Sequence, residues 1–201
     1  MKHWFFPGQL LFTAIFCIVI AWFAGCKSQE NKTPKDSGGE NANEEPLYPF
    51  KPFIDSELHC LDSMPLAILK VEKWNSKTID SALLTADSVK FYAGLFTATD
   101  PNDKHLRPLY HEEAFLDMTL GYNTFLITAS DKTLPLQSAT VLLHPETNAV
   151  ERLLLHTQDS ARTIIRQLTW RKHKSLQVVE QFTNQSGPMP DVHVTNITWD
   201  Q

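Results

Sequence analysis

Apolar residues recur at helical spacing in two stretches after residue 46. In the first stretch they lie three or four positions apart, which predicts a helix that ends near Pro65. Its apolar stripe consists of Phe50, Ile54, Leu58 and Leu61. A second helix is expected to begin at Thr85, because threonine is a good N-cap and Asp87 would lie in the first turn. The side chains expected to pack inward from it are Val89, Tyr92 and Phe96.

From Ala114 onward the apolar residues recur at every second position, the spacing of β-strands. In residues 115–129 we expect this spacing to place Leu116, Met118, Leu120, Tyr122 and Leu126 on one face. Two hairpins should follow, with turns at residues 145–148 and 172–174. Residues 191–199 should form the last strand, and residues 66–74 should add an edge strand.

Four or five consecutive strands with short turns predict an antiparallel meander. The expected fold class is therefore α+β, a curled antiparallel sheet with one or two N-terminal helices packed on it. Residues 47–201 have the size of a single domain with its own core, and we find no second linker in them.

The first 25 residues have the composition of a secretory signal peptide. Their only lysine or arginine is Lys2, and they contain no acidic residue. The apolar run over residues 10–25 is shorter than the roughly 20 residues that a membrane-spanning helix needs. Two small residues, Ala24 and Gly25, directly precede Cys26.

This junction resembles the lipobox of bacterial lipoproteins, with Phe23 in the place of the usual leucine. The resemblance implies cleavage between Gly25 and Cys26, diacylglycerol on the Cys26 sulfur, and acylation of the new amine with a fatty acid such as palmitate. Several acyl chains together hold a protein on a bilayer, so the membrane would be a partner through the lipid on Cys26. The alternative is an uncleaved anchor with an incidental cysteine.

Residues 26–46 would be the lipidated cysteine and a disordered tether. Residues 27–46 contain no aromatic and no branched aliphatic side chain, so they cannot bury enough apolar surface to offset their ordering entropy. Lys27 follows the cysteine where some bacteria place an aspartate for inner-membrane retention, which favours the outer membrane. The domain would lie in the periplasm or at the cell surface. A net charge of -5 speaks against a nucleic-acid partner.

The three cysteines leave no pair for a disulfide in the mature chain. Cys17 would leave with the signal peptide, Cys26 would carry lipid, and Cys60 stands alone. A lone thiol in an oxidising compartment survives best when it is buried, so we expect Cys60 to be a small core residue.

Patterns for catalysis or metal binding are sparse, and we predict no catalytic residue, metal or cofactor. The histidines have no close zinc-ligand spacing, and there is no Gly-x-Ser-x-Gly elbow or phosphate-binding glycine loop. The densest cluster, His111-Glu112-Glu113, is interpreted as a solvated turn. A Ser-His-Asp triad from distant residues remains an alternative. Core packing is favoured over a ligand face for Trp74, Trp170 and Trp199.

The strand region carries two further resemblances. The segments "AFLDMTLGYNTFLITA", "LLHPETNAVERLLL" and "LTWRKHKSLQVV" resemble uncharacterised envelope lipoproteins of Bacteroidota over most of residues 50–199. The hairpin over residues 141–155 is similar to one in lipoprotein carrier proteins, whose open barrel holds acyl chains.

The first resemblance implies O-glycosylation at Asp-Ser-apolar sequences. Such sequences begin at Asp62, Asp80, Asp87 and Asp159. Ser160 is the best acceptor because it lies between two expected strands. Turn or helix-start chemistry, which also favours Asp-Ser, is the alternative.

Together these observations predict a lipid-anchored cell-envelope protein whose domain is a non-catalytic binding module for a partner protein or an apolar ligand. An envelope hydrolase and a structural or assembly factor of the outer membrane are the alternatives. A concave apolar pocket would favour binding, whereas a nucleophile within hydrogen-bond reach of a base would favour the enzyme. A large flat apolar patch would favour assembly.

Overall fold

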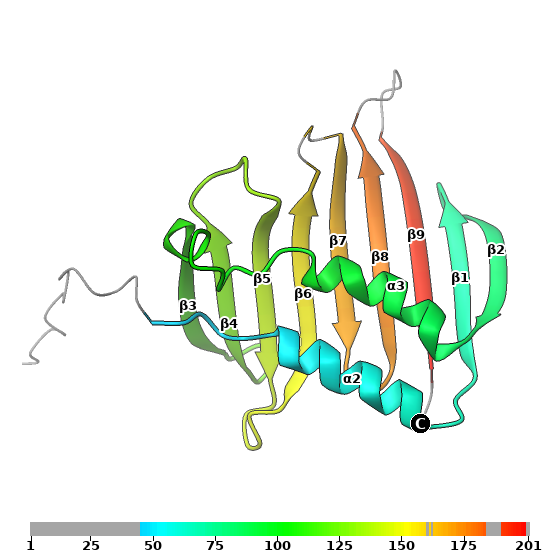
Figure 1. Cartoon of the computed structure of the whole chain (residues 1–201), viewed down its shortest axis with the longest axis horizontal. Helices are drawn as coiled ribbons and strands as arrows, with labels where there is room; N and C mark the ends of the chain where they lie inside the picture. The colour runs from blue at the N-terminus through cyan, green and yellow to red at the C-terminus, as the bar shows by residue number, and fades with distance from the viewer. Residues whose placement is uncertain (1–44, 160, 162, 184–189, 200–201) are drawn as a thin grey trace, which may run out of the picture. The chain divides into compact units, whose positions relative to one another are not determined.

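The computed structural model describes residues 45–159, 161, 163–183 and 190–199. Within them, nine strands form one antiparallel sheet in the order β2-β1-β9-β8-β7-β6-β5-β4-β3 (Figure 1). The sheet is not closed, because β2 and β3 are its two edges, and two α-helices pack on it. The predicted α+β class, an antiparallel meander with helices packed on the sheet, is confirmed.

The elements have the following bounds. The strands are β1 (Ile68–Trp74), β2 (Lys77–Leu84), β3 (Tyr110–Asp117), β4 (Tyr122–Ala129), β5 (Leu136–Leu143), β6 (Val150–Gln158), β7 (Ile164–Arg171), β8 (Ser175–Phe182) and β9 (Asp191–Thr198). The helices are α2 (Lys51–Ser63), α3 (Ala86–Thr97) and the short 3-10 helix η1 (Arg107–Leu109).

Both predicted helices form, and local sequence explains where α3 begins. The Thr85 hydroxyl accepts a hydrogen bond from the Ser88 amide at 3.3 Å, and Asp87 lies in the first turn. Val89 and Phe96 are buried, as expected. Because both helices cover the same face of the sheet, they share its core with the helix-facing side chains of the strands (Figure 1).

The two predicted hairpins also form, at the β5–β6 and β7–β8 turns. Asn148 has φ 54° and His173 has φ 53°, so each turn places one residue in the left-handed region. Asparagine tolerates this conformation better than most residues, which is why the turn after Pro145 could be predicted.

The single apolar face expected in residues 115–129 is wrong, because the chain reverses there and forms β3 and β4. The Asp117 carboxylate accepts two backbone amides of the turn, and Gly121 has φ +71°, which favours glycine. Leu116, Met118 and Leu120 are therefore 52, 84 and 55% exposed instead of forming one buried face.

The strand predicted over residues 66–74 forms as β1, but it does not lie at an edge of the sheet. β1 pairs with β9 on one side and with β2 on the other, so the unexpected strand β2 forms the edge. The run His111-Glu112-Glu113, expected to be a solvated turn, lies in β3 at the opposite edge. Charged side chains on an edge strand discourage pairing with other chains.

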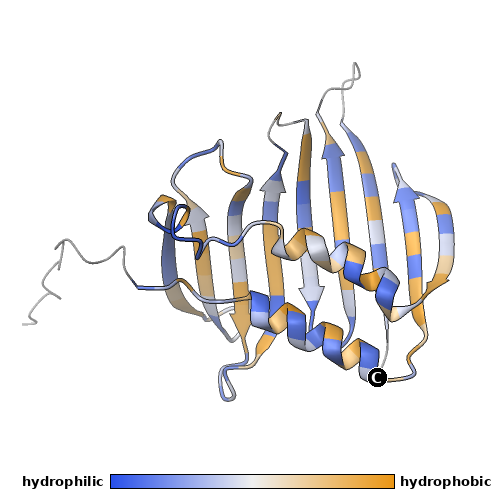
Figure 2. Cartoon of the chain, in the orientation of Figure 1, coloured by the Kyte–Doolittle hydropathy of each residue, from blue (hydrophilic) through white to orange (hydrophobic). Residues whose placement is uncertain are grey.

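The core lies between the helices and the sheet. Apolar and polar residues alternate along several strands, as the colours in Figure 2 show. The ring of Trp170 lies 5.3 Å from that of Phe96 and 5.8 Å from that of Trp199, and all three are buried. Core packing is thus confirmed for Trp170 and Trp199, whereas Trp74 is half-buried beside Phe182 at the end of β1.

A buried carboxylate connects α2 to the sheet. Glu57 is 2% exposed, and its Oε2 accepts hydrogen bonds from Trp170 Nε1 at 3.2 Å and from the His173 amide at 2.7 Å. His173 Nδ1 lies 3.0 Å from Glu57 Oε1, outside the direction that a hydrogen bond needs. Glu57 therefore serves two donors that would otherwise be unsatisfied where α2 meets the β7–β8 turn.

The buried Tyr110 hydroxyl should make the free energy of unfolding depend on pH in the alkaline range. Its ring is buried, its hydroxyl donates to the Leu136 carbonyl at 3.0 Å, and burial raises its pKa from 10.0 to about 12. The unfolded chain therefore loses this proton first, so the stability that neutral Tyr110 contributes is complete below about pH 10 and is lost as the pH rises toward 12. Tyr110→Phe should flatten this alkaline loss, as measured by urea unfolding at a series of pH values.

The same substitution should cost about 1 kcal/mol at neutral pH, because the Leu136 carbonyl loses its donor. An alkaline loss as steep in Tyr110→Phe as in the wild type would contradict the prediction.

Candidate functional site

The two α-helices do not extend over the end of the sheet that holds β3 and β4. α2 and α3 lie over the strands from β5 to β1, whereas β3 and β4 are crossed by residues 45–50, which lead into α2, and by the segment containing η1 that connects α3 to β3 (Figure 1). We call residues 45–50 the leading segment.

Side chains from distant parts of the chain hold the leading segment in place. The Glu112 carboxylate accepts a hydrogen bond from the Tyr48 amide at 2.6 Å. The Asn102 amide forms a pair of hydrogen bonds with the Leu47 backbone, at 2.8 and 3.1 Å. Glu112, expected in a solvated turn, therefore fixes the backbone of the segment that covers β3 and β4.

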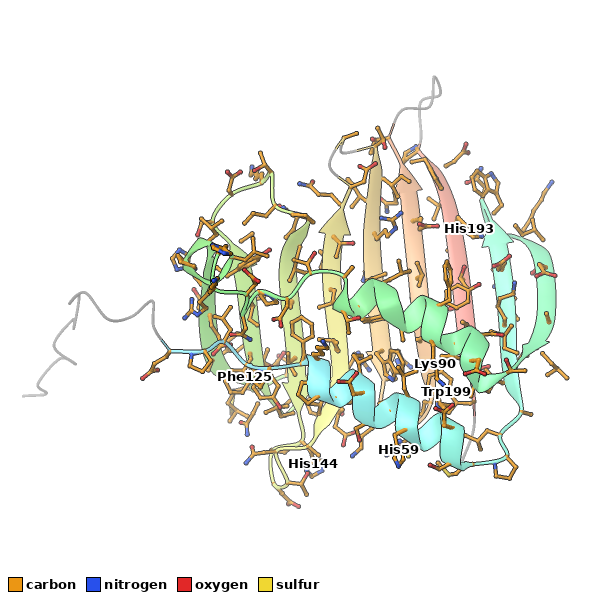
Figure 3. All side chains as sticks on the ribbon, viewed as in Figure 1. His59, Lys90, Phe125, His144, His193 and Trp199 are labelled. Carbon is orange, nitrogen blue, oxygen red and sulfur yellow. The ribbon has the colours of Figure 1, made fainter. Side chains whose placement is uncertain are left out.

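An open groove lies beside this segment. The Tyr48 ring is 4.7 Å from the Phe125 ring, and Figure 3 shows Phe125 close to the leading segment. The groove has a volume of about 610 Å³, within the range of ligand sites. Its lining includes Tyr48, Ala114, Asn123, Phe125, Leu143 and Asn148. We call it the aromatic groove.

The chemistry of the aromatic groove is that of binding. Its walls are mainly aromatic and aliphatic, and Asn123 donates to the Asn148 side-chain oxygen at 3.2 Å. Among the described residues that line it, only Tyr48 is ionisable, and burial raises its pKa above 10.0. The groove therefore offers apolar contact and amide hydrogen bonds, but no general base for neutral pH.

Sequence reasoning did not single out Tyr48 or Phe125. The groove joins segments that are far apart in the chain, so neither periodicity nor spacing reveals it. One usable signal was the sequence Leu47-Tyr48-Pro49-Phe50, where aromatic residues appear directly after the polar tether.

A ladder of polar and aromatic side chains occupies the helix-facing side at the other end of the sheet. Trp74, His193, Glu180 and Arg166 lie directly opposite one another on β1, β9, β8 and β7. The Glu180 carboxylate lies 2.8 Å from Arg166 Nε and 3.3 Å from His193 Nδ1, near the upper end of β9 in Figure 3. Cross-strand pairs of opposite charge stabilise a sheet. In the described chain no hydroxyl or thiol hydrogen-bonds to His193, so this ladder contains no nucleophile paired with a base.

The adjacent residues His59 and Cys60 do not form a nucleophile and base. Consecutive helical side chains point about 100° apart. His59 is exposed on the lower side of α2 in Figure 3, whereas Cys60 is half-buried. The expectation that Cys60 is a core residue is corrected: Ile54, Glu57 and Leu61 form the buried stripe of α2, and Cys60 lies at its margin.

Gly25, Cys26 and Ser160 lie outside the described residues. Next to Ser160, the Asp159 carboxylate accepts the amides of Thr163 and Ile164 at 2.6 and 3.1 Å, and the hydrogen bond from the Thr163 hydroxyl lowers its pKa. The other three Asp-Ser aspartates form ion pairs, with Lys70 or Lys90: Asp62, Asp80 and Asp87. Each aspartate of the pattern therefore has a structural role.

In the part of the chain that the structure describes, no three side chains of His, Cys, Asp or Glu gather as metal ligands would. None of the described helices is long and apolar enough to cross a membrane. Comparison with protein-family models, with curated proteins and with solved structures gave no match.

Proposed function

We propose that this chain is a lipid-anchored protein of the cell envelope, at the outer membrane, whose domain binds an apolar ligand or an apolar segment of a partner without catalysis. The observation that carries the binding role is the aromatic groove, an uncovered apolar cavity of about 610 Å³. The lipobox-like junction at Cys26 supports the anchor.

The position of the groove fits an anchored binding protein. Tyr48, which forms part of its wall, lies in the segment through which the chain from Cys26 reaches the domain. A ligand in the groove would therefore be held near the point where the anchor joins. The apolar walls match an acyl chain, and the amides of Asn123 and Asn148 can accept or donate hydrogen bonds at its polar end.

The test uses the fluorescent fatty acid cis-parinaric acid as the probe. The wild-type chain should bind it with a rise in probe fluorescence, and Ala114→Trp should weaken binding at least about tenfold because the indole fills the groove. Thr128→Trp is the matched control, because Thr128 is an exposed position on the same strand pair.

Equal binding by wild type and Ala114→Trp would show that the probe binds elsewhere and would contradict this use of the groove. If the probe does not bind the wild type at all, the acyl-chain form of the proposal fails. An apolar peptide that binds the wild type and loses affinity in Ala114→Trp would then support the partner-segment form.

A further inference from the structure

Three turns of the meander lie at the same end of the sheet. Because successive strands alternate in direction, the β3–β4, β5–β6 and β7–β8 turns share one end, at the bottom of Figure 1. His144, at the β5–β6 turn, marks this end in Figure 3. We call it the lower edge.

Two arginines near the lower edge face each other with like charge. Arg152 on β6 and Arg171 on β7 are direct partners in the strand register. Both lie on the side of the sheet away from the helices, because their neighbours Leu153 and Trp170 are buried on the helix-facing side. Like charges directly opposite in a sheet are destabilising, so this pair is costly unless an anion binds between them.

The arginines belong to a small basic pocket. A cavity of about 130 Å³ is lined by Arg152 and Arg171 together with Tyr122, Glu151, Lys172 and Lys174. Its four cations face one carboxylate, a balance of +3 in a chain whose net charge is -5. A pocket of this size fits a phosphate group, which arginine binds through two parallel hydrogen bonds.

The cations of this basic pocket are poorly neutralised by the protein. In the described part of the chain their one acidic contact joins Lys172 Nζ to Glu151 Oε1, and it is long, at 3.8 Å. Among the described residues, neither Arg152 nor Arg171 has a carboxylate within ion-pair distance. Arg166 on the other face differs, because Glu180 lies 2.8 Å from it.

Exposed apolar side chains lie next to the basic pocket. Met118 and Leu120, in the β3–β4 turn, are 84 and 55% exposed. Tyr122 follows the turn directly and lines the basic pocket, so it connects the apolar turn to the cations at the lower edge. Apolar side chains beside basic ones are the combination that binds the surface of an anionic bilayer.

We propose that the lower edge docks on an anionic phospholipid bilayer, with Arg152 and Arg171 binding a lipid phosphate and Met118 and Leu120 entering the interface. This inference rests on the proposed function, because a tethered domain stays close to a membrane. Two features favour a bilayer as the partner. The cations complement anionic headgroups, and the exposed apolar turn can enter a bilayer interface, whereas a free anion offers it no apolar contact.

The experiment uses the full-length lipidated chain in vesicles of phosphatidylcholine, with or without phosphatidylglycerol. A photoreactive benzophenone amino acid replaces Met118 in one sample and Ile79 in the control. Ile79 is 56% exposed on β2, near the β1–β2 turn at the opposite end of the sheet. Lipid crosslinking per vesicle-bound chain at position 118 should exceed that at position 79 about fivefold or more, only with phosphatidylglycerol, and should fall at high salt.

The double substitution Arg152→Gln/Arg171→Gln should reduce crosslinking at position 118 to the level at position 79. It should leave folding intact, because it removes a like-charge pair. Lys73→Gln/Lys77→Gln is the matched control, because it removes two cations at the opposite end and should leave crosslinking unchanged.

Crosslinking at position 118 that does not depend on phosphatidylglycerol or on the two arginines would overturn the proposal. Inorganic phosphate that binds the wild type and not the arginine variant, without any change in crosslinking, would also overturn it and show a site for free phosphate. Failure of the lipid anchor can be told apart from failure of this proposal. Chains that an uncleaved N-terminal segment holds in the vesicles would carry no palmitate label.

Discussion

Replacing Glu57 by alanine should lower the free energy of unfolding by about 3 kcal/mol or more. The substitution leaves Trp170 Nε1 and the His173 amide without an acceptor beneath α2, and it also leaves a cavity. Each unsatisfied buried donor costs about 1–3 kcal/mol, so this is the largest stability effect that we expect from one polar side chain. Urea unfolding, with its midpoint and slope, measures the effect.

Two variants make this result specific. Glu57→Gln keeps the volume and one acceptor oxygen, so its loss of stability should lie between those of wild type and Glu57→Ala. Glu113→Ala removes an exposed carboxylate from β3 and should change stability by no more than about 0.5 kcal/mol. A loss of unfolding free energy below about 1 kcal/mol in Glu57→Ala would contradict the prediction. It would mean that water replaces the carboxylate as acceptor and that Glu57 contributes little to the packing of α2 on the sheet.

Cys26→Ser should abolish incorporation of radioactive palmitate and leave the chain an unprocessed precursor. The reason is chemical: the lipobox resemblance places diacylglycerol on the Cys26 sulfur, and a serine hydroxyl does not substitute for the thiolate nucleophile. Labelling of cells followed by gel separation measures both the palmitate and the size of the chain.

Cys17→Ser is the matched control, because it removes a thiol from the same apolar N-terminal region but leaves the residues before Cys26 unchanged. It should label and mature as the wild type does. Undiminished labelling in Cys26→Ser would refute the anchor, while the aromatic groove could still bind its ligand.

The sequence predicted those elements whose start or turn depends on contacts between residues only a few positions apart. Thr85 begins α3 because its hydroxyl reaches an amide three residues later, and Asn148 completes the β5–β6 turn because it tolerates positive φ. Neither effect depends on the rest of the fold, so both could be identified from sequence.

The turn between β3 and β4 could not be identified in the same way. Its residues Met118 and Leu120 are apolar and continue the two-residue period of the flanking strands, so the pattern does not change where the chain reverses. Asp117 and Gly121 were the local signs of a turn. The exposure of these side chains is unusual for a turn, and it is the same feature that suggests contact with a bilayer.

Glu57 shows why the tertiary sites were missed. It interrupts an apolar stripe of Phe50, Ile54 and Leu61 at helical spacing, a position where a carboxylate would be expected to face water. Its donors, Trp170 and His173, come more than 100 residues later, so only the assembled sheet shows that the carboxylate has partners.

The pairing of β1 with β9 sets an order on folding. Strands β3 to β8 pair only with their neighbours along the chain, and β9 pairs with β8, so hairpin closure can build this part of the sheet step by step. The β1–β2 hairpin has no other place in the sheet than beside β9, as in the pair Leu69 and Thr198. This hairpin can therefore join the sheet only after residues 191–198 have been synthesised. Under the proposed envelope location, the β1–β2 hairpin would stay outside the sheet until nearly the whole chain had crossed the membrane.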